Sequence, residues 1–203
     1  MAYFARYRPE FGFKFAFDGL HNAPSSQVYA ALTMLNPPGG FYGNPPNPNQ
    51  VGLSSIVDWE GPLTSPRFIE GYSTFKGIEP RKSTHIIAEI KTLNLSKKVP
   101  QISSVGWTVI PLFTSDGYFL TGMYQIPLIT GEVNKNIIDV IIANDAHPWE
   151  VITQNITAKK VKWLSTASIM IRLLDGQREV FSFVFCLIDL KREILSMLGT
   201  LRE

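Results

Sequence analysis

Charged residues are scarce in this sequence, and neither sign dominates. Of its 203 residues 18% are charged, and 19 Lys and Arg offset 17 Asp and Glu to leave a net charge of +2. A protein that binds nucleic acid mainly through its electrostatic field needs a dense basic stripe, so this balance argues against a nucleic-acid partner. Hydrophobic residues make up 45% of the chain, enough to bury the core of one domain.

Cysteine is almost absent, and no segment has the pattern of a signal peptide or a membrane span. Cys186 is the only cysteine, so no internal disulfide can form and the fold depends on packing, as in a reducing compartment. The first ten residues lack the apolar core of a secretory signal, and the apolar run at residues 180–190 is too short to span a bilayer. These absences predict a cytoplasmic protein.

No group of residues has the spacing of a catalytic or metal site. The three histidines, His21, His85 and His147, lie far apart and have no cysteine nearby, so a zinc site is not expected. His147 and Glu150 could form an acid/base pair, but the proline and tryptophan between them favour an ordered loop at residues 144–150. We predict no catalytic residue, metal or cofactor. The alternative is an enzyme whose site is assembled from distant loops.

Alternating apolar residues predict a fold built mainly of β-strands. Residues 11–18 read FGFKFAFD, which places Phe11, Phe13, Phe15 and Phe17 on one face of a strand. Asp-Gly pairs at positions 116–117 and 175–176 each stand between two strand-like runs, a strong hairpin signal. Further strands are predicted at residues 27–35, 67–75, 83–93, 105–113, 118–129, 162–174 and 178–187.

Three segments depart from this pattern. Residues 1–10 form an aromatic arm, and residues 36–52 are packed with Pro, Gly and Asn, which predicts a long irregular loop. Residues 189–203 place apolar side chains at spacings of three and four, which predicts a short amphipathic helix. The rest, residues 11–190, is expected to be one antiparallel β-sandwich.

Candidate protein-binding residues lie outside the predicted strands. Aromatic side chains of the arm and of the loop tip suit protein contacts, because they bury a large rigid area at low entropic cost. The alternative is that they cover the edge of the sandwich. These residues are Tyr3, Phe4, Tyr7, Phe41 and Tyr42.

The densest basic spot consists of Lys159, Lys160 and Lys162, with Trp163 beside them. Such a spot could contact phospholipid headgroups or an acidic protein partner. The alternative is an ordinary solvated entry into a strand.

The order of the predicted elements resembles a C2-type domain. Residues 17–20 read FDGL and residues 28–32 read VYAAL, similar to the opening of such domains. Residues 106–113 (GWTVIPLF) and 122–128 (GMYQIPL) resemble a pattern of C2-like domains in ciliary and coiled-coil-containing scaffold proteins. The resemblance covers residues 11–190 and implies an all-β, C2-like antiparallel β-sandwich, here followed by the short C-terminal helix.

The resemblance also implies a function. It predicts a non-catalytic structural or adaptor subunit that binds other proteins in a larger ciliary, axonemal or cytoskeletal assembly, with tubulin or a coiled-coil protein as candidate partners. Calcium-dependent members cluster aspartates on the loops at one end of the sandwich, whereas Asp18, Asp139 and Asp145 stand apart here. The alternative function is a calcium-independent, peripheral membrane domain that binds phospholipid.

Overall fold

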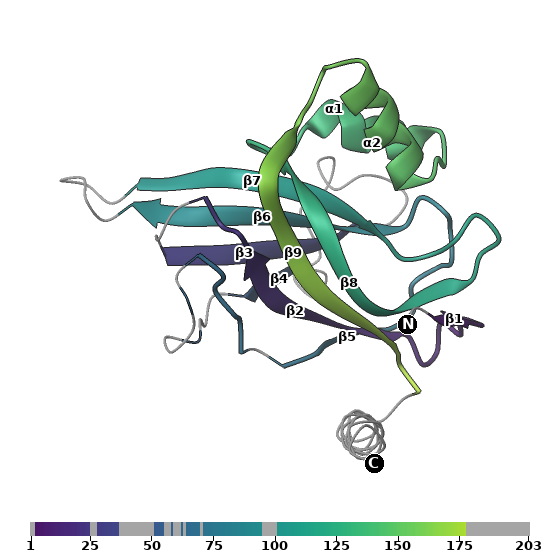
Figure 1. Ribbon diagram of the computed structural model, residues 1–203. Coiled ribbons are helices and arrows are strands. Elements are labelled where there is room, and N and C mark those ends of the chain that lie inside the picture. The colour runs from purple at the N-terminus through teal and green to yellow at the C-terminus, as the bar shows by residue number, and fades with distance from the viewer. Residues whose placement is uncertain are drawn as a thin grey trace, which may run out of the picture.

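The computed structural model describes residues 3–24, 28–36, 51–54, 58, 62, 64–69, 71–94 and 101–177. Over these residues the chain forms one curled, nine-stranded antiparallel sheet and two short helices (Figure 1). A mainly β, antiparallel fold is therefore confirmed. The elements are β1 (Tyr3–Ala5), β2 (Phe13–His21), β3 (Val28–Asn36), β4 (Val51–Ser54), β5 (Ser73–Phe75), β6 (His85–Asn94), β7 (Gln101–Pro111), β8 (Phe119–Thr130), α1 (Lys135–Ala143), α2 (Pro148–Thr157) and β9 (Trp163–Asp175).

Most of the predicted strands are confirmed, with their ends shifted by a few residues. The predictions at 27–35, 83–93, 105–113, 118–129 and 162–174 correspond to β3, β6, β7, β8 and β9, and β5 occupies only the end of the strand predicted at 67–75. The strand predicted at 178–187, the helix at 189–203 and most of the loop at 36–52 lie outside the described residues.

The sheet encloses the main core by curling over itself. Its strand order is β4-β3-β6-β7-β8-β9-β2-β5, and β1 pairs with β8. In Figure 1, β8, β9 and β2 run diagonally across the direction of β7, β6 and β3. Buried side chains from both groups of strands pack into one cluster, for example Ile169 of β9 and Ile86 of β6. Two parts of one sheet thus supply the opposing walls of this core.

The aromatic run in β2 lines this core. Phe13, Phe15 and Phe17 are at most 3% exposed, as the alternation predicts. Phe13 stacks on Phe75 of the edge strand β5 with 5.0 Å between ring centroids. The prediction is wrong for Phe11, which precedes the first residue of β2 and is 40% exposed.

Helices α1 and α2 pack on the other face of the sheet, and the first residues of α2 replace the end of the loop predicted at residues 144–150. They form a second core with Trp107 and Val109 of β7 and with Ile129 of β8. The signals for α1 are the N-cap Asn134 and isoleucines spaced along one helical face, and α2 begins with Pro148. No helix in the described part of the chain is long and apolar enough to cross a bilayer.

The role of the aromatic run can be tested with two matched variants. Phe13→Ala should lower the free energy of unfolding by about 3 to 5 kcal/mol, because it empties a fully buried aromatic site. Phe11→Ala removes the same atoms from an exposed position and should lower it by less than about 1 kcal/mol. Urea denaturation followed by circular dichroism measures both. Equal losses would contradict the placement of Phe11 outside the core.

Candidate binding site

Strands β7 and β8 touch at two places and are separated between them. They pair near one end, where Gly106 lies opposite Thr130. Beyond the opening, Phe113 just after β7 forms a bridge with Phe119, the first residue of β8. No β7–β8 pairing occurs between these two places in the described strands. The sheet is therefore open over the middle of both strands.

The residues of the two strands favour this separation. Proline has no N–H to donate to a ladder, and Pro111 of β7 and Pro127 of β8 both border the opening. Gly122 in β8 has φ of 137°, a conformation that favours glycine. At the paired end, Gly106 allows the close approach of β8, because a Cβ there would lie 2.8 Å from the carbonyl oxygen of Ile129.

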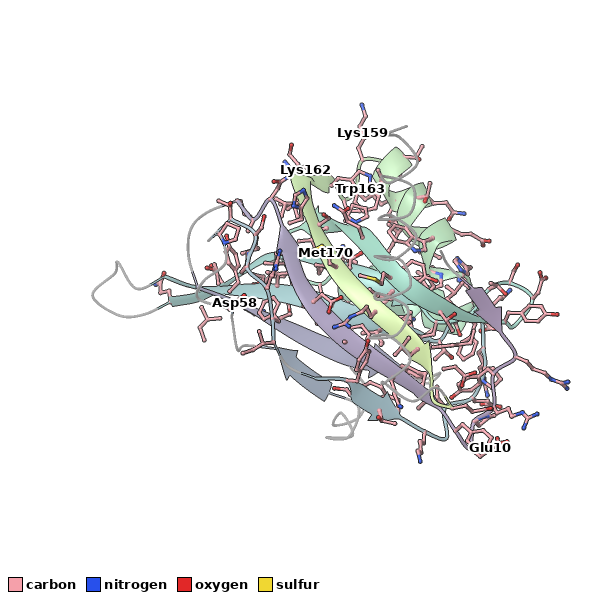
Figure 2. The ribbon with its side chains drawn as sticks, turned by 60° about the horizontal axis from the view of Figure 1, so that its bottom comes forward. Glu10, Asp58, Lys159, Lys162, Trp163 and Met170 are labelled. Carbon is pink, nitrogen blue, oxygen red and sulfur yellow. The ribbon has the colours of Figure 1, made fainter. Side chains whose placement is uncertain are left out.

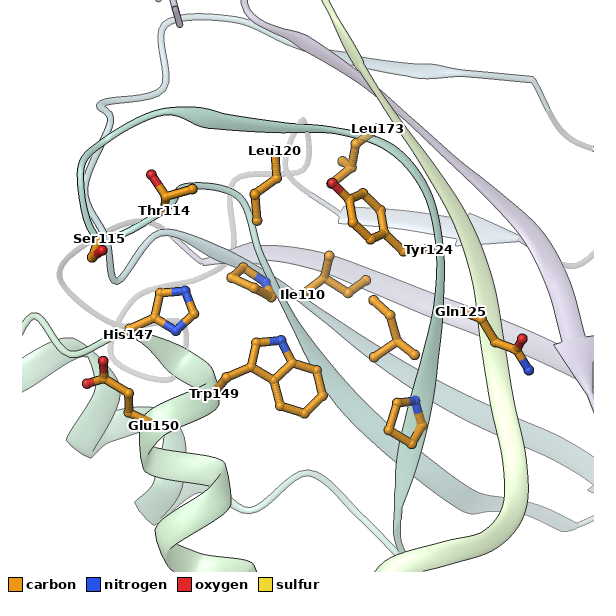
Figure 3. Close-up of a pocket in the computed structure, with 13 residues that line it drawn as sticks. Ile110, Thr114, Ser115, Leu120, Tyr124, Gln125, His147, Trp149, Glu150 and Leu173 are labelled. Carbon is orange, nitrogen blue, oxygen red and sulfur yellow. The ribbon is translucent and has the colours of Figure 1, made fainter. Parts of the chain in front are cut away.

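A pocket of about 540 Å³ occupies the opening between β7, β8 and α2 (Figure 3). Most of its lining is apolar and includes residues of the main core, and its polar groups come from the hairpin tip, from β8 and from the start of α2. The lining residues are Ile110, Pro111, Thr114, Ser115, Leu120, Tyr124, Gln125, Ile126, Pro127, His147, Trp149, Glu150 and Leu173.

Trp149 joins the two cores at this pocket. It is the second residue of α2, and its side chain packs against both the main core and the helix-side core. Its ring centroid lies 6.0 Å from that of Trp163, the first residue of β9. In Figure 3 the indole forms one wall of the pocket, with Tyr124 across from it. An apolar group that entered the pocket would therefore contact an aromatic ring.

The turn between α1 and α2 fixes the start of α2 beside the pocket. Asp145 follows α1 with φ of 44°, and the N–H of Ala146 donates to the carbonyl of Ile141, as at a helix end closed by a left-handed residue. The Asp145 carboxylate accepts hydrogen bonds from the backbone N–H and the hydroxyl of Ser83, just before β6. This carboxylate thus ties the helical turn to the sheet.

The polar groups of the pocket hold their positions through hydrogen bonds. The Tyr124 hydroxyl donates to the carbonyl of Thr121 at 3.1 Å, and the Gln125 amide donates to the Ser168 hydroxyl at 2.8 Å. Burial raises the pKa of Tyr124, so its phenol stays protonated and neutral. These side chains offer fixed polar contacts rather than charges.

His147 and Glu150 lie at the helix side of the pocket. Burial lowers the pKa of His147, although Glu150 and a hydrogen bond with the Phe113 backbone oppose the shift. The imidazole is therefore largely neutral at neutral pH. Glu150 is the only Asp, Glu, Lys or Arg among the lining residues. The pocket thus combines an apolar floor with one exposed negative charge at its rim.

His85 is a second histidine with a lowered pKa, but it lies inside the protein. It is fully buried, and burial lowers its pKa to about 4, although its Nδ1 hydrogen bond with the Ser83 carbonyl acts in the opposite direction. The alternation in residues 83–93 predicts a surface position on a strand for His85, and this prediction is wrong. His85 anchors the start of β6 next to the residue that holds Asp145.

The arm residues predicted to bind proteins lie near the tip of the β7–β8 hairpin. Tyr3 and Phe4 are in β1, where their backbones pair with Thr121 and Leu120. The ring centroid of Tyr7 lies 5.0 Å from that of Phe113, and burial raises the pKa of Tyr7 to about 12. Tyr7 thus covers the edge of the core. A binding role for the arm remains a prediction.

Phe41 and Tyr42, the other predicted protein contacts, lie outside the described residues.

The three lysines of the basic spot lie together in the turn between α2 and β9. Lys159, Lys160 and Lys162 are all exposed, and none makes an ion pair with another described residue. Trp163 beside them is 37% exposed. Figure 2 shows Lys159, Lys162 and Trp163 at the same end of the molecule. The lysines are separate from the lining of the pocket.

The two sequence motifs behind the family resemblance converge on the pocket. GWTVIPLF supplies Ile110 and Pro111, and GMYQIPL supplies four consecutive lining residues, 124–127. Sequence reasoning singled out both motifs but did not predict that they border one opening. The prediction of a loop at residues 144–150 also missed the contribution of α2.

Among the described residues, no group of three or more His, Cys, Asp or Glu side chains is placed to hold a metal ion.

Comparison of the sequence with models of known protein families and with curated proteins finds no match.

The buried His85 predicts a loss of stability in acid. Its pKa is about 4 in the folded protein against 6.5 for the free side chain. The unfolded state therefore binds more protons between these values, and stability falls as pH falls through this window. From pH 7 to pH 5 the loss due to His85 should be about 2 kcal/mol.

Urea denaturation at both pH values tests this expectation. His85→Asn keeps a polar side chain but removes the titration, so its stability should depend less on pH. His21→Asn changes an exposed histidine and serves as the control. An identical pH dependence in wild type and His85→Asn would contradict the assignment.

Proposed function

We propose that this chain is a non-catalytic adaptor subunit that binds another protein through the pocket between β7, β8 and α2. The observation that carries the proposal is the opening in the sheet, where Ile110 of the main core and Leu120, which packs against that core, border a pocket of about 540 Å³. A pocket of this size, mostly apolar and with a few fixed polar groups, is typical of a binding site. Side chains of a partner that enter this pocket could contact the residues at the edge of the main core.

The chemistry of the lining supports binding rather than a reaction. Trp149 and Tyr124 present aromatic surface, and aromatic residues dominate the energy of many protein contacts. Two of the polar groups beside this surface, the Tyr124 hydroxyl and the Gln125 amide, are held by hydrogen bonds within the protein. They would orient a bound segment while the apolar floor supplies most of the binding energy.

The C2-like sandwich and the ciliary or cytoskeletal setting belong to the same proposal. Both rest on the resemblance of residues 106–113 and 122–128 to scaffold proteins of that kind. Tubulin or a coiled-coil protein remains a candidate partner on the same ground. The convergence of these two segments on one pocket supports a shared binding role for them.

Two neighbouring variants of the hairpin tip test this function. Ser115 lines the pocket and Asp116 does not, and both are exposed in the same turn. Ser115→Trp should block the pocket and Asp116→Trp should leave it open, with little change in thermal stability for either. If one large apolar side chain of a peptide can no longer be buried in the pocket, the affinity of that peptide should fall by about tenfold or more.

The measurement uses peptides selected from a phage-displayed random library on the wild-type protein. Their dissociation constants for wild type, Ser115→Trp and Asp116→Trp are then measured by fluorescence anisotropy. Selected peptides should lose affinity for Ser115→Trp alone. The proposal fails if no peptide is selected, or if every selected peptide binds all three proteins equally.

The basic spot supports a second candidate function, contact with an anionic membrane surface. Three exposed lysines, which form no ion pair with another described residue, directly precede the partly exposed Trp163. Each lysine near an anionic surface contributes about 1 kcal/mol, and tryptophan favours the headgroup region. In addition, Lys159 has φ of 56°, which costs about 1 kcal/mol compared with glycine.

Lys159→Gly separates stability from membrane binding. It should raise the melting temperature, because glycine accepts the left-handed conformation, yet it should weaken sedimentation with phosphatidylserine-containing vesicles. Lys76→Gly, which removes an exposed lysine near the end of β5, is the charge control. Wild-type protein that does not sediment with these vesicles at low salt would rule out this second function.

A further inference from the structure

The four consecutive pocket residues of β8 indicate how a partner would bind. Side chains of neighbouring residues in a strand point to opposite faces. A pocket against one face would therefore be lined by every second residue. Tyr124, Gln125, Ile126 and Pro127 all line this pocket, so it must follow the edge of β8 that faces β7.

Among the described residues, no strand pairs with this edge of β8 between Gly122 and Pro127, and the short pairing of β8 with β1 ends at Thr121. Over Gly122–Pro127 the other edge of β8 pairs with β9. Strand β7 likewise uses its far edge to pair with β6, and it contributes only Ile110 and Pro111 to the pocket. A strand edge without a neighbour is a template for an added strand, because its backbone groups need hydrogen-bond partners.

On β8 the pocket is lined by one unbroken run of four residues. The run from Tyr124 to Pro127 spans about 10 Å, at roughly 3.3 Å per residue, and Leu120 lines the pocket again nearer the hairpin tip. The space beside this run therefore lies along the edge of β8 and suits a short stretch of extended chain.

We infer that the pocket binds an extended segment of a partner protein, which pairs with the open edge of β8 and carries a basic residue near Glu150. This inference rests on the proposed function and specifies its partner. Every second side chain of the segment would enter the apolar floor beside Trp149, since a strand has a period of two. Main-chain hydrogen bonds to β8 would hold the segment in register.

The charge of the pocket supports the basic residue. Glu150 is the only Asp or Glu among the lining residues, and the neighbouring His147 is largely neutral at neutral pH because burial lowers its pKa. A lysine or arginine at that end of the segment would complement this charge. The pair is exposed, so its contribution should be modest, roughly two- to fivefold in affinity.

The experiment uses a peptide selected on the full-length protein and sensitive to Ser115→Trp. Each backbone amide of the peptide is methylated in turn, which removes one N–H without changing the side chain. Methylation at alternate positions should weaken binding about tenfold or more. Methylation at the positions between should change it little, because those N–H groups point away from β8.

A second readout tests the charge. A selected peptide with a basic end should bind Glu150→Lys roughly two- to fivefold more weakly than wild type, and replacing its basic residue by glutamate should reverse this preference. Glu132→Lys is the matched control, because Glu132 is also exposed but does not line the pocket. Equal effects of both variants would overturn the assignment of the basic residue.

The outcomes separate this inference from the proposed function. A peptide that is sensitive to Ser115→Trp but insensitive to methylation would bind the pocket through its side chains alone, which would overturn strand pairing. Failure to obtain any pocket-dependent peptide would remove the proposed function itself. Self-association of the protein that is abolished by Ser115→Trp, measured by analytical ultracentrifugation, would place a second copy of the chain in the pocket and also overturn the inference.

Discussion

The structure depends on a sheet that has to cover a core on each of its faces. The curled inner face encloses the aromatic core around Phe13, while the outer face of β6, β7 and β8 packs against α1 and α2. Strand β7 takes part in both, with Ile110 in the main core and Trp107 in the helix-side core. Strand β8 parts from β7 in this region, and Trp149 contacts both cores beside the opening.

In this arrangement the opening between β7 and β8 lies next to parts of the structure that are held firmly in place. The carboxylate of Asp145 binds Ser83 and fixes the turn before α2 to the sheet, which determines where Trp149, His147 and Glu150 lie. The hairpin tip closes the far end of the opening through the bridge between Phe113 and Phe119. A binding site with walls held in this way loses little entropy when a ligand orders it further.

Local patterns predicted most of the strands, although not β1 or β4, and they did not predict the site. Strict alternation identified β2, and Asp116-Gly117 identified the β7–β8 turn, because both signals act over a few residues. Phe11 was misplaced because alternation does not specify where a strand begins. Helices α1 and α2 were missed because each is short, and their apolar residues pack on a sheet face that the sequence did not reveal.

The pocket could not be predicted from local patterns, because it depends on the separation of two strands that a hairpin turn normally keeps paired. Pro111 and Pro127 were visible signals, since each removes a donor from a ladder. These prolines indicate an opening only once it is known that β8 pairs with β9 along its other edge. The motifs around these prolines were the most specific part of the sequence, and they converge on the opening.

The most direct test of the central claim is amide hydrogen exchange, measured by NMR on the free and the peptide-bound protein. Binding along the open edge should slow exchange at alternate amides of β8 between Gly122 and Ile126, while the amides already paired with β9 change little. Slower exchange confined to other regions, such as the turn at residues 158–162, would contradict a binding site between β7 and β8.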